Sequence, residues 1–262
     1  MTSQSDYSVL DRPEVLQFLF YPREDWGPPP PGASDHFVVV EGNVAISCRF
    51  YPCRTNAPSI LYFHGNGEVV TDYDWIAPAY NKEGLNLFVA DYRGYGASGG
   101  RPTISSMMAD AHPIFNYFQH MLKEAGYDDR LFIMGRSLGA YSMVEIASRY
   151  QEQLKGLIAE SGFANISRLL RYLSIPVEPG RLKALEEAHL AKIRSIHLPV
   201  LIIHGEWDEL IPPTEATKFY ETVGSQQKRL VPIPGAGHND ILLVGMGLYF
   251  SAIREFVFGK GG

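Results

Sequence analysis

One short segment of the chain has the residue types that activate a serine. Residues 135–139 read Gly-Arg-Ser-Leu-Gly and directly follow the apolar run Leu131 to Met134. A nucleophile on a sharp turn between a strand and a helix sits in strained backbone, so its neighbours must be small for the turn to close. The helix that begins there points N–H groups at an oxyanion formed beside the serine. Ser137 is therefore the candidate nucleophile.

A serine hydroxyl also needs a base that takes its proton and an acid that orients the base. Two later apolar runs lead into residues of these types. Asp208 follows the run at 200–204, and His238 follows the run at 229–233. The order Ser137, Asp208, His238 along the chain is typical of hydrolases built on a parallel sheet. These three residues are the predicted nucleophile, acid and base.

The reaction would also need N–H donors for the negative charge that develops on the substrate oxygen. One donor is expected from Leu138, the residue after the serine, and another from the loop after an early strand. Residues 63–68, Phe-His-Gly-Asn-Gly-Glu, occupy that position. We therefore predict an oxyanion hole made by the backbone N–H groups of Asn66 and Leu138. The side chain of Asn66 is given no role.

The elements that must position these residues form an alternating series. Near-continuous apolar runs alternate with helix-length stretches, which indicates a parallel sheet covered by helices on both faces. Such sheets bind their ligands at the carboxyl ends of the strands, where the candidate residues lie. Two further runs flank Glu41-Gly42-Asn43 and predict a hairpin. The predicted strands are 37–40, 44–51, 60–63, 85–90, 131–134, 156–159, 200–203 and 229–233, and the predicted helices include 104–125, 138–150 and 213–223.

Two stretches fall outside this alternation. Residues 1–36 form an N-terminal lead-in that we expect to pack on the domain through Phe18 to Tyr21. Its Gly-Pro-Pro-Pro-Pro-Gly segment at 27–32 predicts an irregular strap, because proline lacks an N–H and has a fixed φ. Residues 162–197 carry two predicted helices, one on each side of Pro176 and Pro179-Gly180, which predicts a small lid. Residues 37–262 are therefore predicted to be one α/β domain with a lid insertion.

Length, charge and cysteine content limit the class of protein. The chain has 262 residues, of which 45% are hydrophobic and 20% charged, as expected for a globular domain. A net charge of −6 provides no basic field for nucleic acid. Cys48 and Cys53 are too few for a disulfide framework, and we expect two reduced thiols. We see no targeting signal or transmembrane segment, which predicts a cytoplasmic protein.

Together the motifs resemble the α/β-hydrolase superfamily, in its serine-hydrolase branch. The similarity covers roughly residues 37–258 and rests on motifs at 63–67, 91–99, 135–139, 204–208 and 235–238. It implies an α/β fold with an eight-stranded, mostly parallel sheet and a cofactor-free reaction through an acyl-enzyme. It also favours Asp208 as the acid over Glu206, Glu209 and Glu160. Within the superfamily the chain is most similar to short-lidded esterases and thioesterases, including protein depalmitoylases.

The expected reaction is hydrolysis of a carboxylic ester or thioester, with a small-molecule or acyl substrate and neither cofactor nor metal. A serine peptidase or amidase is the enzymatic alternative, because the same three residues cleave amides. A non-catalytic binding module of this fold is another alternative. A third is a peripheral membrane enzyme, whose apolar face would come from the lid or from residues 241–247.

Several other residues in these motifs have structural interpretations. His64 and His204 each precede a glycine at a strand end, and we expect both to bond nearby backbone. Residues 91–96 are rich in glycine but lack the lysine and register of a phosphate-binding loop. They predict a structural loop that borders the pocket. Residues 241–247 are apolar and interrupted by glycines, which predicts a loop that either lines an acyl pocket or packs on the core.

Overall fold

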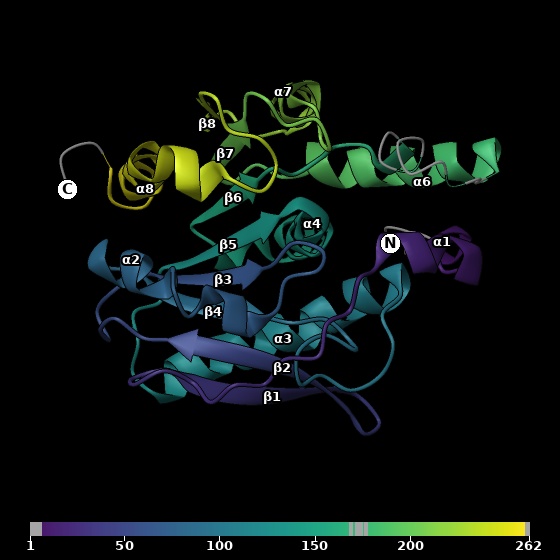
Figure 1. Ribbon diagram of the computed structural model, residues 1–262. Coiled ribbons are helices and arrows are strands. Elements are labelled where there is room, and N and C mark those ends of the chain that lie inside the picture. Colours follow the sequence, from purple (N-terminus) through teal and green to yellow (C-terminus); the bar gives the residue numbers. More distant parts are fainter. Residues whose placement is uncertain (1–6, 168–169, 171–174, 176–177, 260–262) are drawn as a thin grey trace.

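The structure, a computed structural model, describes residues 7–167, 170, 175 and 178–259. Its centre is an eight-stranded sheet with the strand order β1-β2-β4-β3-β5-β6-β7-β8 (Figure 1). The pairs β1–β2 and β2–β4 are antiparallel, and the pairs from β4 through β8 are parallel. The predicted eight-stranded, mostly parallel sheet is confirmed.

The strands lie where the apolar runs predicted them, and the predicted hairpin is the β1–β2 pair. Runs buried on both faces stand out in a sequence because no polar residue interrupts them. The strands are β1 Ser34–Glu41, β2 Val44–Tyr51, β3 Ser59–Phe63, β4 Asn86–Ala90, β5 Leu131–Arg136, β6 Gly156–Glu160, β7 Val200–Gly205 and β8 Lys228–Ile233.

Helices cover both faces of this sheet, and each face has its own apolar core. Side chains alternate along a strand, so Leu61 belongs to one core and Tyr62 to the other. The first core includes side chains of α3, α4, α6 and α7, and the second includes side chains of α2 and α8. The α-helices are α1 Pro13–Leu19, α2 Ala77–Lys82, α3 Ile104–Glu124, α4 Ala140–Tyr150, α6 Pro179–Arg194, α7 Pro213–Thr222 and α8 Ile241–Phe258; the 3-10 helices are η1 Tyr7–Val9, η2 Val70–Tyr73, η3 Ser137–Gly139 and η4 Gln151–Gln153.

Residues 241–247, predicted as a loop, are instead the start of α8. The helix continues through Gly245 with a kink, where φ is −130° and ψ is 28°. A Cβ atom at Gly245 would lie 2.2 Å from Ile233 Cγ2, so the glycine lets the helix approach β8 closely. Gly245, one of the glycines that suggested a loop, therefore serves helix packing.

Helix α8 is also long and apolar enough to cross a membrane, by length and composition alone, and 28% of it is buried. Leu243 is 80% exposed, and Val244, Met246 and Leu248 are exposed as well. Several core residues nevertheless come from the same helix, among them Tyr249, Phe250 and Ile253. The expectation that the chain lacks a transmembrane segment stays a prediction.

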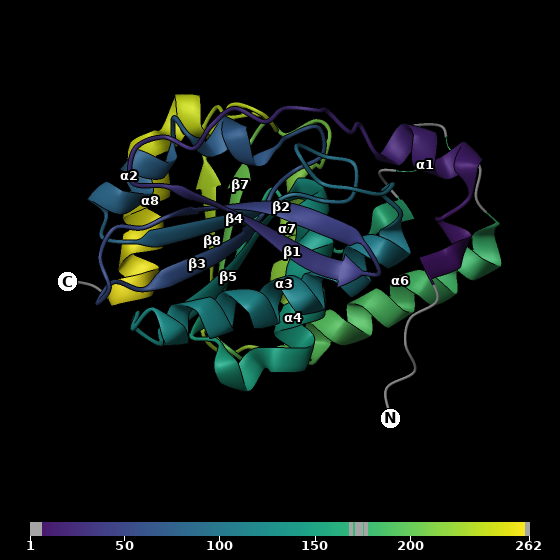
Figure 2. The same cartoon turned by 90° about the horizontal axis from the view of Figure 1, so that it is seen from below.

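The lead-in packs on the first core. Leu10, Val15 and Leu19 are buried there together with the side chains of α3 and α4. Residues 20–33 have no helix or strand and run from α1 across the molecule to β1 (Figure 2). Arg49 holds this strap by donating to the carbonyl of Gly27 at 2.7 Å. Cys48 and Cys53 are both free thiols, as expected.

The later of the two helices predicted at 162–197 is α6, whereas the earlier one falls largely outside the described residues. Helix α6 packs on α4, the helix that follows Ser137. Lys192 forms an ion pair with Glu145 of α4. His189 is buried and stacks on Tyr141, with ring centroids 4.0 Å apart and an angle of 10° between the planes.

The packing of His189 predicts a pH dependence of stability. Burial, aided by the charge of Lys192 and opposed by that of Glu145, lowers the pKa of His189 from 6.5 to about 3. The unfolded chain therefore binds a proton below pH 6.5 that the folded chain does not, so stability is full above that pH and falls as the pH drops toward 3. We expect His189→Phe to remove a slope of up to about 1.4 kcal/mol per pH unit.

Urea unfolding between pH 7 and pH 4.5 measures this slope. His120→Gln is the control, because His120 is exposed on α3. Equal slopes in the wild type and His189→Phe would contradict the prediction.

Candidate active site

The turn at Ser137 has the strained geometry that its sequence predicted. Ser137 follows β5 directly and has a φ of 49°, in the left-handed region that side chains other than glycine rarely adopt. A Cβ atom at Gly135 would lie 2.6 Å from the carbonyl oxygen of Gly139. A Cβ atom at Gly139 would lie 2.2 Å from the carbonyl oxygen of Phe63, at the end of β3. Both glycines are therefore required by close backbone contacts.

These contacts predict that a methyl group added at Gly139 strongly lowers the stability of the fold. Gly139→Ala is expected to destabilise the fold by about 3 kcal/mol or more, because neither β5 nor the end of β3 can move without disturbing the sheet. Gly247→Ala is the matched control, since a Cβ atom there has no neighbour within 4 Å. Chemical denaturation measures both. A Gly139→Ala protein as stable as Gly247→Ala would contradict this account.

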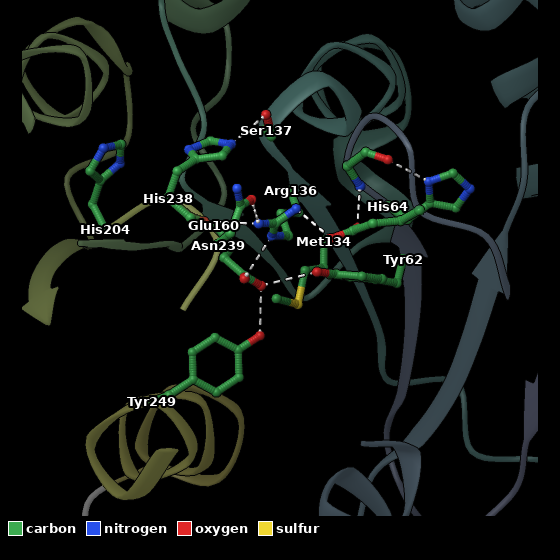
Figure 3. A network of polar contacts seen from close by, with 12 residues as sticks. Tyr62, His64, Met134, Arg136, Ser137, Glu160, His204, His238, Asn239 and Tyr249 are labelled. Carbon is green, nitrogen blue, oxygen red and sulfur yellow. Dashed lines mark hydrogen bonds and ion pairs between the residues drawn. The ribbon is translucent and has the colours of Figure 1, made fainter. Parts of the chain in front are cut away.

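The structure brings Ser137, His238 and Asp208 together from the segments that follow β5, β8 and β7. Figure 3 shows the imidazole of His238 facing Ser137. The Nε2 atom of His238 lies 2.9 Å from the hydroxyl oxygen of Ser137, and its Nδ1 atom lies 2.7 Å from Oδ2 of Asp208. The other oxygen of Asp208 accepts the N–H of Ile211 at 2.7 Å. A carboxylate held in this way fixes the tautomer with Nδ1–H toward Asp208, which leaves Nε2 free to accept the serine proton.

The competing carboxylates lie elsewhere. Glu206 and Glu209 are exposed, while Asp208 between them is buried. Glu160 is buried, and it accepts hydrogen bonds from Tyr62 at 3.0 Å and Tyr249 at 2.7 Å. The sequence around Glu160 gives no sign of these tyrosines, because they come from β3 and α8.

Asn66 lies in the loop after β3 and Leu138 lies directly after Ser137, at the positions where an oxyanion hole was predicted. Leu138 is the second residue of η3, so its N–H belongs to the first turn, which has no acceptor within the helix. The side chain of Asn66, given no role above, holds the lead-in. Its Oδ1 accepts the Tyr21 N–H at 3.0 Å and the Tyr95 hydroxyl at 2.6 Å, and its Nδ2 donates to the Leu19 carbonyl at 2.8 Å.

His64 and His204 bond nearby backbone, as predicted. His64 lies 2.8 Å from the Gly65 carbonyl, and its other ring nitrogen lies 3.0 Å from buried Asp91. His204 donates to the carbonyl of Ile211 at 2.7 Å, and the same nitrogen is 3.4 Å from Asp208 Oδ2. Burial lowers the pKa of His204, which keeps the ring neutral beside the acid.

A cavity of about 180 Å³ opens beside His238. It is apolar at Trp75, Ile76 and Leu242, and polar at Arg136, Glu68 and Glu160, and it meets the candidate residues at His238 rather than at Ser137. The start of α8 therefore lines a cavity, as the sequence suggested for residues 241–247. Residues 91–96 were expected to border the pocket and are absent from this lining. Among the described residues, no group of three or more His, Cys, Asp or Glu could hold a metal ion.

The family model Hydrolase_4, described as serine aminopeptidase, S33, matches residues 55–178 and 181–242. The chain belongs to this α/β-hydrolase family. Its fold is that of other solved α/β hydrolases. An esterase of Pyrococcus furiosus, Pf2001, covers 90% of the chain and 97% of its own with a TM-score of 0.72 at 20% identity. The family supports a hydrolase.

Similar sequences come from several organisms. The uncharacterized membrane protein YNL320W of Saccharomyces cerevisiae is 31% identical over 186 residues, which is 70% of this chain and 64% of the yeast protein's length. The human alpha/beta hydrolase domain-containing protein 17B is 30% identical over 219 residues, 81% of this chain and 70% of its own. Protein bem46 of Schizosaccharomyces pombe is 28% identical over 208 residues, 76% of this chain and 67% of its own.

Proposed function

We propose that this protein is a serine hydrolase that cleaves carboxylic esters or thioesters through an acyl-enzyme. The observation that carries the proposal is the hydrogen-bond chain from Ser137 through His238 to Asp208, with its 2.9 Å and 2.7 Å contacts. A buried acid, an oriented imidazole and a strained serine at the end of a parallel strand are together what nucleophilic catalysis needs.

The reaction has two halves. Ser137 Oγ attacks the carbonyl carbon while its proton passes to His238 Nε2, and the carbonyl oxygen becomes an oxyanion facing the N–H groups of Asn66 and Leu138. The bond to the leaving oxygen or sulfur then breaks, and that atom takes the proton from Nε2. Water then attacks the acyl carbon while its proton passes to His238 Nε2. The bond between the acyl carbon and Ser137 Oγ breaks, and Oγ takes that proton, which releases the acid and free Ser137. Each oxyanion donor is worth about 3 kcal/mol of barrier.

The test uses a fluorophosphonate probe and intact-mass measurement on the purified protein. We expect one stoichiometric adduct on Ser137, formed much more slowly in His238→Ala. A panel of p-nitrophenyl esters and acyl thioesters of increasing chain length then ranks substrates. A folded wild-type protein that forms no adduct would overturn the proposal and favour a non-catalytic binding module.

Amide hydrolysis is the second candidate function, because the description of the matching family model names a serine aminopeptidase. Matched aminoacyl p-nitroanilides and p-nitrophenyl esters separate the two functions, since both release a chromophore from the same acyl group. A higher kcat/KM for the anilide would replace the esterase proposal with a peptidase. A higher value for the ester supports the first proposal.

A further inference from the structure

The residue just before the candidate nucleophile contacts the loop that carries the candidate base. Arg136 is the last residue of β5, and its side chain is only 10% exposed. One of its terminal nitrogens, Nη2, donates to the backbone carbonyl of His238 at 2.8 Å and to Oδ1 of Asn239 at 2.9 Å (Figure 3). The guanidinium is thus bonded to the peptide unit of His238 itself.

The other terminal nitrogen reaches the loop that carries Asn66. Nη1 of Arg136 forms an ion pair with Oε1 of Glu68. Oε2 of Glu68 accepts the backbone N–H of Gly65 at 2.7 Å and the hydroxyl of Tyr73 at 2.9 Å. The loop also rests on the guanidinium directly, because a Cβ atom at Gly65 would lie 2.4 Å from Nη1. Glu68 thereby links Arg136 to the residue that precedes Asn66.

A second carboxylate completes the surroundings of the guanidinium. Nε of Arg136 lies 3.4 Å from Oε1 of Glu160, whose Oε2 accepts the hydroxyls of Tyr62 and Tyr249. Burial alone would raise the pKa of Glu68, but the charges of Arg136 and His64 together with the hydrogen bonds from Gly65 and Tyr73 outweigh it and lower that pKa. Glu68 therefore stays ionised beside the guanidinium. Removing the Arg136–Glu68 pair from water costs free energy, so the pair contributes little to the stability of the fold. Stability alone therefore does not explain why the pair lies at this position.

We propose that Arg136 is a positioning residue that holds the His238 loop and the Gly65–Asn66 loop in register with Ser137. This inference rests on the proposed function. Arg136 is the neighbour of Ser137 in the chain, so hydrogen bonds from its planar guanidinium to both loops set the positions of these loops relative to the candidate nucleophile. A displacement of about 1 Å in such a site can cost about 10²-fold in rate. Lysine has one ammonium group and cannot span both loops.

The test compares Arg136→Gln and Arg136→Lys with a matched variant, Arg49→Gln. Arg49 is also buried, and it also bonds two carboxylates and one backbone carbonyl, those of Asp35, Asp74 and Gly27. These partners lie outside the candidate site. Thermal unfolding of each variant confirms that it is folded before its activity is compared with that of the wild type.

The first readout is the split between kcat and KM for the best ester in the panel. Arg136→Gln is expected to lower kcat by about 10- to 100-fold with KM changed by less than about threefold, because the loops shift relative to Ser137 while the apolar lining of the cavity at Trp75, Ile76 and Leu242 remains in place. Arg136→Lys should recover part of kcat, and Arg49→Gln should keep it. Equal kcat losses in Arg136→Gln and Arg49→Gln would overturn the positioning role.

The second readout does not depend on activity. Amide hydrogen exchange is expected to rise together in residues 64–68 and 237–240 of Arg136→Gln, and in neither segment of Arg49→Gln. A wild-type protein without hydrolase activity, combined with this coupled loosening, would refute the proposed function and keep the positioning role. An active wild type with unchanged exchange in Arg136→Gln would refute the positioning role alone.

If Arg136→Gln does not fold, Glu68→Gln carries the test. This change weakens only the link to Gly65, so exchange should rise at 64–68 and stay unchanged at 237–240. Its kcat should fall less than that of a variant that loses both links. Exchange that rises equally in both segments, or in neither, would overturn the assigned roles of the two links.

Discussion

Ser137→Ala is expected to lower kcat for ester hydrolysis by about 10⁴- to 10⁶-fold and to abolish the fluorophosphonate adduct. The variant loses the hydroxyl that forms the acyl-enzyme in the proposed mechanism, while the proposed oxyanion donors and the cavity remain. The residual rate should therefore still exceed that in water. Steady-state kinetics and intact mass measure the two effects on the same preparations.

Ser142→Ala is the matched control for this change. Ser142 is buried on α4, close to Ser137 in sequence, and its hydroxyl bonds only the carbonyl of Met107, at 3.4 Å, among the described residues. Its removal should leave kcat within about twofold of wild type, as expected for a weak hydrogen bond outside the site. His238→Ala should lose nearly as much rate as Ser137→Ala, because the two act as a unit. A Ser137→Ala protein that still forms the adduct would place the nucleophile elsewhere.

The sequence could predict the candidate residues because each lies within a few residues after the end of a strand. Parallel strands end at one edge of the sheet, so residues that follow β5, β7 and β8 must approach one another. The apolar runs that locate these strands are easily recognised, since both faces of the sheet are buried. The strained turn at Ser137 was also predictable, because the glycines that it requires lie within two residues of the serine.

Contacts between distant segments could not be predicted in this way. Asn66 bonds Leu19 and Tyr21, and nothing in the pattern around Asn66 indicates that the lead-in returns to it. Arg136 had no predicted role, yet it is bonded to His238, 102 residues later. Such pairings depend on tertiary geometry, and a single sequence carries no signal for them. Helix α8 was missed for a related reason, since Gly245 accommodates Ile233 rather than ending the helix.

Asp208→Asn is expected to lower kcat by about 10³- to 10⁴-fold, as the orienting acid becomes neutral. Asp208 accepts at both oxygens, from Ile211 N–H and from His238 Nδ1. An amide has one oxygen, so one of these two donors must lose its acceptor. If the amide oxygen still accepts the Ile211 N–H, the amide N–H₂ faces Nδ1 of His238. The ring then adopts the tautomer that carries its proton on Nε2, and Nε2 can no longer accept the proton of Ser137. If the oxygen faces His238, the N–H of Ile211 is left unsatisfied in a buried site and stability falls instead.

Kinetics and thermal unfolding together separate these two outcomes. A loss of kcat at unchanged melting temperature indicates the wrong tautomer, and a loss of stability with partial activity indicates the flipped amide. Glu206→Gln and Glu209→Gln are the controls, because both side chains are exposed beside Asp208. Each should retain kcat within about twofold, since an exposed charge at this distance is screened by water. A loss in either control equal to that of Asp208→Asn would mean that the loop, rather than its buried carboxylate, orients the histidine.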